Sequence, residues 1–137
     1  MTMKAVRAMS NRQMNERIAL ATGWEKGPSR NSWYAQKNAC WHRVGSKEDW
    51  QDFPPWFSGD LNAMHEVEAK LGRPRSHTDW AKLDSYRIWL EQVVEYKPVC
   101  SSAVEERWNV AFASARQRAI AYILMLDEME RERERTQ

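Results

Sequence analysis

Apolar residues recur at intervals of three and four along four segments of the chain, which is typical of helices with one buried face. The clearest segment opens on Asp60, whose carboxylate can accept hydrogen bonds from the free amides of a first helical turn. It closes at Gly72, with Pro74 just beyond the helix end. The pattern therefore predicts a helix over residues 60–71. Its apolar stripe consists of Leu61, Met64, Val67 and Leu71.

Two further helices are predicted from similar signals. A short helix is expected over residues 12–22, with Asn11 as its N-cap and Gly23 in the left-handed position after its end. Thr78 can cap a third helix, in which apolar residues recur at threes and fours. The β-branched and aromatic residues at 88–96 leave open whether the second half of this segment is helix or strand.

The last segment carries the strongest local start signal. Ser114 and Gln117 form a capping box, in which each side chain can accept a hydrogen bond from the backbone amide of the other. A long helix is predicted from residue 115 to about residue 130. Its predicted buried face consists of Ala115, Ala119, Tyr122, Ile123, Leu126 and Met129.

Alternating and β-forming residues predict three short strands. WYAQ, residues 33–36, and CWHRV, residues 40–44, lie between turn-forming residues, which favours a hairpin or a meander. Trp108, Val110 and Phe112 alternate with Asn and Ala, which predicts a third strand with these three side chains on one face.

The order of these elements predicts an α+β fold, in which a small, largely antiparallel sheet is layered between helices as an α-β-α sandwich. Residues 1–10 are expected to form a flexible N-terminus, residues 11–130 a single domain, and residues 131–137 a charged C-terminal tail that frays. Residues 45–57 form a loop whose aromatic side chains are expected to pack on the body of the protein, because they carry much apolar area.

Composition narrows the classes of function. The 137 residues match one ordinary domain, and the net charge of +2, from 21 basic and 19 acidic residues, is too small to suggest nucleic-acid binding. No apolar run is long enough to span a bilayer, and the N-terminal MTMKAVRAMS lacks the apolar region of a secretory signal. We therefore expect a soluble protein of the cytoplasm, with Cys40 and Cys100 as free thiols.

Little in the sequence favours metal binding or catalysis. Structural zinc sites use paired arms such as Cys-x-x-Cys, and His42, His65 and His77 stand in no such arrangement. Neither cysteine lies in a nucleophile elbow or beside a glycine-rich oxyanion loop. The sequence predicts no metal, no cofactor and no catalytic residue, so a hydrolase or nuclease is the least favoured class.

Three motifs in order along the chain resemble the phage ABA-sandwich family, which consists of small proteins from bacteriophages and prophages. They are N-x-x-I-A-x-x-x-G-W at residues 15–24, P-x-x-x-x-D-L-N-A-M-H-E at residues 55–66 and A-S-A-R-Q-R-A at residues 113–119. The resemblance spans about residues 12–126. It implies an α-β-α layered fold and a phage context, and it implies no reaction.

Polar residues at the start of the central helix are candidate site residues. Asp60, Asn62 and His65 lie in its first two turns, where the helix dipole favours anions. The simpler interpretation is that Asp60 caps the helix, Asn62 faces solvent or a loop amide, and His65 lies at the helix edge. A ligand pocket is the alternative.

Arginine and aromatic residues supply the other candidates. Arg116 and Arg118, in the first turn of the last helix, can pair internally with an acid such as Asp60 or bind a carboxylate or phosphate of a partner. Aromatic side chains of the loop can pack on their own domain or anchor a protein interface. They are Trp50, Trp56 and Phe57.

The favoured function is that of a small, non-enzymatic phage or prophage accessory protein that binds and modulates a host protein, such as a defence component. The resemblance and a composition rich in Arg, Trp and Tyr favour it. The alternative is a binding module, or sponge, for a small anionic or nucleotide ligand at Arg116, Arg118 and the Asp60 helix start. The sequence leaves open whether the chain forms a homo-oligomer, and it indicates no membrane partner.

Overall fold

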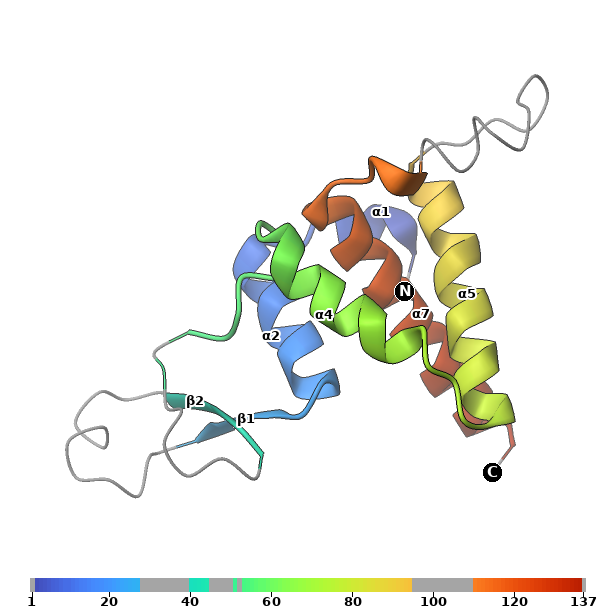
Figure 1. Cartoon of the computed structure of the whole chain (residues 1–137), viewed down its shortest axis with the longest axis horizontal. Helices are drawn as coiled ribbons and strands as arrows, with labels where there is room; N and C mark the ends of the chain where they lie inside the picture. The colour runs from blue at the N-terminus through green and yellow to red at the C-terminus, as the bar shows by residue number, and fades with distance from the viewer. Residues whose placement is uncertain (1, 28–39, 45–50, 52, 95–109, 137) are drawn as a thin grey trace.

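The computed structural model describes residues 2–27, 40–44, 51, 53–94 and 110–136 (Figure 1). These residues form helices and one small antiparallel sheet, which confirms the α+β class. The elements are α1 (Met3–Arg7), α2 (Asn11–Ala21), β1 (Trp24–Gly27), β2 (Cys40–Arg43), α4 (Leu61–Leu71), α5 (His77–Val93) and α7 (Ala115–Arg135).

Helix α7 is the centre of the molecule. Every residue from Arg118 to Met125 is buried, so this part of the helix is covered on all sides. Helices α1, α2, α4 and α5 all contact α7, and α5 lies along it in the opposite direction (Figure 1). Four residues of the predicted face, Ala115, Ala119, Tyr122 and Ile123, are buried, whereas Leu126 and Met129 are partly buried. Burial also extends to residues outside that face.

Local sequence signals set the helix starts. The predicted capping box of Ser114 and Gln117 is present, and Asp60 caps α4 as predicted. The N-cap of α2 is Ser10 and not Asn11, because Ser10 forms a reciprocal box with Gln13, three residues into the helix.

The start of α5 also differs from the prediction. Its N-cap is Ser76 and not Thr78, since the Ser76 hydroxyl accepts from the Asp79 amide at 3.2 Å. The Asp79 carboxylate in turn accepts from the backbone amide of Arg75 at 3.0 Å. The sequence did not decide between helix and strand for residues 88–96. In the structure, residues 88–93 are helical, and Leu90 and Val93 are buried.

The N-terminus differs from the expected flexible segment. Residues Met3–Arg7 form α1, whose first turn is capped by the Thr2 hydroxyl. Val6 is completely buried, and α1 contacts α7. A helix of five residues spans too few positions to show a helical period, which is why the sequence pattern did not predict it.

The sheet is a pair of short strands beside α2. Strand β2 (Cys40–Arg43) confirms the strand predicted at residues 40–44, whereas β1 occupies Trp24–Gly27, where the sequence pattern predicted no strand. Trp24 pairs with Arg43 and Gly27 with Cys40, and Gly23 makes the turn into β1 with a φ of 91°. The pair lies at the edge of the helical body, where β1 contacts α2 (Figure 1). The strand predicted at 33–36 lies outside the described residues.

The prediction of a third strand over residues 108–112 is wrong for residues 110–112, which the structure describes. Val110 and Ala111 are helical, Phe112 lies in a turn, and the Phe112 side chain is 69% exposed. Trp108 lies outside the described residues. Alternation over so few positions is also compatible with the end of a helix, so periodicity alone cannot separate the two. At the C-terminus, α7 continues to Arg135, so the charged residues from 131 extend the helix with their side chains exposed.

The position of Ile123 in this core generates the first prediction. Ile123 is completely buried in α7, so Ile123→Ala should lower the free energy of unfolding by about 2 to 5 kcal/mol. Ile88 on α5 is the matched control, because it is about half exposed, and Ile88→Ala should cost less than about 1 kcal/mol. Urea unfolding of both variants measures the difference, and equal losses would contradict the described packing of α7.

Candidate functional site

The best-defined candidate site is the tight turn that leads into α4, residues 53–60, here named the Trp56 turn. Pro54 and Pro55 restrict the backbone before Trp56. The Trp56 carbonyl accepts from the amides of Gly59 at 3.2 Å and Asp60 at 2.7 Å, which closes the turn. The Trp56 turn is therefore a hydrogen-bonded structure and not an open loop.

Two contacts tie the Trp56 turn to the rest of the protein. Phe57 is 4% exposed and belongs to the hydrophobic core. The backbone amide of Ser58 donates to the Asn15 side-chain oxygen of α2 at 2.9 Å, and this bond is buried. Phe57, a candidate partner-binding residue in the sequence, thus anchors the turn from within, as loop packing on its own domain would require.

The Trp56 indole is exposed and lies close against Gly59. Its side chain is 60% exposed, whereas the ring lies directly over Gly59. A Cβ atom at Gly59 would lie 2.3 to 2.7 Å from three indole atoms, so the close approach requires glycine. Phe53, at the start of the turn, is 70% exposed, and Leu61, the first residue of α4, is 42% exposed. The expected packing of the loop aromatics on the body of the protein is therefore correct for Phe57 and wrong for Phe53 and Trp56. The Trp56 turn therefore carries a concentration of exposed apolar side chains.

The polar candidates at the start of α4 have structural or solvent-facing positions. The Asp60 carboxylate accepts from the Asn62 amide at 2.9 Å, which is the capping geometry predicted from the sequence. Asn62 and His65 are exposed on α4. Neither of the two cavities described below is lined by these three residues. Trp50, the remaining aromatic candidate, lies outside the described residues.

Arg118 is buried and fully engaged. Its guanidinium donates to Glu68 of α4 at 2.7 Å and to the carbonyls of Val110, Ala111 and Ala113 at 3.0 to 3.1 Å. The acid that pairs with Arg118 is Glu68, not the expected Asp60. Because a buried guanidinium with all these acceptors has no free face, Arg118 serves the fold.

Arg116 has a different set of partners from Arg118, as their spacing of two along the helix requires. It donates to the side-chain oxygen of Asn11, to the carbonyl of Arg7 at 3.1 Å and to that of Met9 at 3.2 Å. Arg116 thus joins the start of α7 to the connection between α1 and α2. The structure does not bring Arg116, Arg118 and Asp60 together as one anion site.

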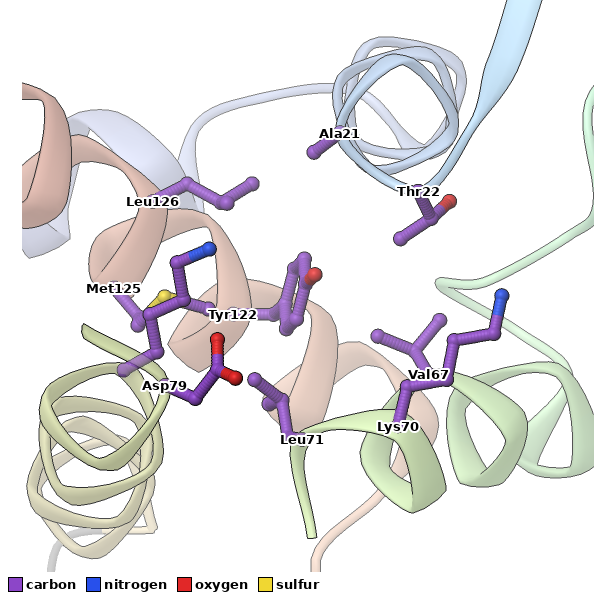
Figure 2. Close-up of a pocket in the computed structure, with 10 residues that line it drawn as sticks. Ala21, Thr22, Val67, Lys70, Leu71, Asp79, Tyr122, Met125 and Leu126 are labelled. Carbon is purple, nitrogen blue, oxygen red and sulfur yellow. The ribbon is translucent and has the colours of Figure 1, made fainter. Parts of the chain in front are cut away.

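The sequence interpretation missed a cavity among four helices. It has a volume of about 330 Å³ and lies between the C-terminal ends of α2 and α4, the start of α5 and the middle of α7 (Figure 2). Lys70, Lys82 and Tyr122 line it together with Asp79 and apolar residues. Lysines on helix surfaces and a tyrosine at core spacing give no distinct signal, because only the packing of four helices brings them together. A second hollow, of about 660 Å³, lies beside Arg116.

Comparison with known proteins finds no matching family model, no matching curated protein and no matching solved structure. The resemblance to phage ABA-sandwich proteins therefore stays a prediction. Among the described residues, no three His, Cys, Asp or Glu side chains lie close enough together to hold a metal ion. In the same part of the chain, no helix has the length and apolar character that crossing a bilayer requires.

The capping role of Asp60 generates a prediction that separates structure from binding. Asp60→Ala should lower the stability by about 0.5 to 2 kcal/mol, because the first-turn amide loses its acceptor. Asp60→Asn should recover most of this loss and should leave binding of any partner unchanged, since it retains a capping oxygen and removes only the charge. Thermal melts and partner capture measure the two effects. Normal melting with lost capture in Asp60→Asn would show that the carboxylate binds the partner.

Proposed function

We propose that this chain is a non-enzymatic phage or prophage accessory protein that binds a host protein through the Trp56 turn. The observation that carries the proposal is the combination of exposure and fixed geometry at Trp56. The indole is 60% exposed, its ring is held against Gly59, and its backbone is closed by two hydrogen bonds.

The energetics of interfaces favour such an arrangement. Tryptophan is enriched among the few interface residues that carry most of the binding free energy. An ordinary exposed side chain loses about 0.5 to 1.5 kcal/mol of conformational freedom when a partner immobilises it. Trp56 is already confined by the Trp56 turn, so less of this cost remains at binding. Phe53 and Leu61, which are close to Trp56 in the chain, are also exposed apolar residues that a partner could contact.

The phage context and the host partner come from the resemblance in the sequence motifs. Those motifs now have physical explanations: Asn15 holds the Ser58 amide, Asp60 caps α4, and Ser114 caps α7. Asn15 and Asp60 support the Trp56 turn directly, so a protein with the same motifs would retain these two contacts.

The alternative function is a module that binds a small anion at Arg116, Arg118 and Asp60. It has less support, because these three residues already bond within the protein. Arg118 is buried in an ion pair with Glu68, and the Asp60 carboxylate holds the first turn of α4. The arginine partners are backbone carbonyls and side chains of this same chain. A ligand would therefore have to displace bonds that the fold uses.

Affinity capture from bacterial lysate tests the proposed function. The wild-type protein should retain host proteins that Trp56→Ala loses. Gly59→Ala should weaken retention without removing any aromatic atom, because the new methyl group must push the indole from its position. For an isolated partner, Trp56→Ala should raise the Kd by at least about 30-fold, which corresponds to the roughly 2 kcal/mol of a dominant interface residue.

Trp80 provides the matched control. It is a tryptophan of similar exposure, 55%, on α5 and outside the Trp56 turn. Trp80→Ala should capture the same proteins as the wild type, and melts should show that all variants are folded. The proposal fails if wild type and Trp56→Ala retain the same proteins.

A further inference from the structure

The cavity among α2, α4, α5 and α7 is lined by both apolar and polar residues. Its volume of about 330 Å³ lies at the lower end of the range of about 300 to 1,000 Å³ typical of small-molecule sites. The apolar residues are Ala21, Val67, Leu71, Met125 and Leu126. The polar residues are Thr22, Lys70, Asp79, Lys82 and Tyr122.

Tyr122 supplies a hydrogen-bond donor to this cavity. Its side chain is only 7% exposed, and its ring packs edge-to-face on Tyr86, with centroids 6.1 Å apart. Figure 2 shows the Tyr122 ring and hydroxyl reaching into the space between α2 and α4. The hydroxyl forms no hydrogen bond with the described residues. A hydroxyl that opens into a cavity in this way can pair with water or with a ligand that enters it.

The protonation of Tyr122 suits an anionic ligand. Burial raises the pKa of the Tyr122 hydroxyl above its usual value, and the positive charge of Arg17 offsets part of the increase. A raised pKa keeps the phenol protonated at neutral pH. The hydroxyl can therefore donate a hydrogen bond to a negatively charged oxygen.

The charged residues of the cavity limit the charge of a suitable ligand. Lys70 and Lys82 form no ion pair with the rest of the described chain. Asp79 contributes one negative charge, although one of its oxygens already accepts from the Arg75 amide. The carbonyl ends of α2 and α4 add partial negative charge. The two ammonium groups outweigh the one carboxylate and the partial charges by only a small positive charge. This balance favours a ligand with a single negative charge over a polyphosphate.

We propose that this cavity binds a small organic carboxylate with an apolar body. The carboxylate accepts hydrogen bonds from the Tyr122 hydroxyl and from the ammonium groups of Lys70 and Lys82. The apolar body lies against the apolar lining residues of α4 and α7, Val67, Leu71, Met125 and Leu126. This site is separate from the Trp56 turn, so the two proposals stand or fall independently.

Titration of the 15N-labelled protein with 3-phenylpropionate at neutral pH tests the proposal by NMR. Amide signals of residues around the cavity should shift and saturate. 3-Phenylpropan-1-ol, which keeps the apolar body, and acetate, which keeps the carboxylate, should each produce no saturable shift at the same concentrations. Inorganic pyrophosphate should also bind more weakly than 3-phenylpropionate.

Paired tyrosine variants give the decisive comparison. Tyr122→Phe should weaken binding by about tenfold, which is the loss expected for a hydrogen bond to a charged group. Tyr86→Phe removes the same atom from a buried tyrosine outside the cavity lining, and binding should be unchanged. Tyr122→Phe should fold, because the lost hydroxyl bonds no described residue.

Lysine variants provide a second measurement. The double variant Lys70→Gln/Lys82→Gln should abolish saturable binding, whereas Lys4→Gln on α1 should bind as the wild type does. No saturable shift with the wild-type protein, or equal affinity of the Tyr122→Phe and Tyr86→Phe variants, would overturn the proposal. If Tyr122→Phe does not fold, unchanged binding in the lysine double variant overturns it.

Discussion

A buried guanidinium is the constraint on which the arrangement of the helices depends. Arg118 lies in the most deeply buried part of α7, with 7% of its surface exposed. A charge in that position is tolerated only when an opposite charge and hydrogen-bond acceptors surround it. Glu68 supplies the charge, and the carbonyls of residues 110, 111 and 113 supply the remaining acceptors. Arg118 therefore ties α7 to α4 and to the segment that precedes α7.

The ion pair also affects its surroundings. The pKa of the Tyr86 hydroxyl is far above its usual value, first because the group is buried and second because the negative charge of Glu68 opposes ionisation. Tyr86 stays neutral, and its ring packs against Tyr122. Glu68 of α4 thus acts on a charged group of α7 and on a hydroxyl of α5.

Both proposed sites follow from the placement of α4, the green helix of Figure 1. Its N-terminal end receives the Trp56 turn, which Phe57 and the bond from Ser58 to Asn15 fasten to the core and to α2. Its C-terminal end contributes Lys70 to the cavity beside Tyr122 (Figure 2). A shift of α4 against α7 would change both sites together, although their ligands are unrelated.

The features that sequence reasoning predicted correctly are local ones. The capping box at Ser114, the cap at Asp60 and the turn at Gly23 depend on residues a few positions apart, so the spacing of residue types suffices to predict them. Helix α7 was also predicted, since its apolar period extends over many residues. The strand over Val110 and Phe112 was wrong because its alternation covers too few positions to exclude a helix end.

The candidate sites depend on long-range packing, which a single sequence does not contain. Trp56 and Phe57 are adjacent in one loop, and only the path of the turn over α2 decides that Phe57 is buried and Trp56 exposed. Arg118 and Glu68 are 50 positions apart, so many acids of the chain were equally good partners in the sequence. The cavity residues come from four helices, and none of them is distinctive alone.

The central claim is that Trp56 is both exposed and fixed in the free protein. The {1H}–15N nuclear Overhauser effect of its indole N–H, assigned by loss of the signal in Trp56→Phe, tests this claim most directly. The account predicts a value close to that of Trp41, whose side chain is 2% exposed, and a lower value after Gly59→Ala. A low value in the wild-type protein, as for a freely moving surface side chain, would contradict it.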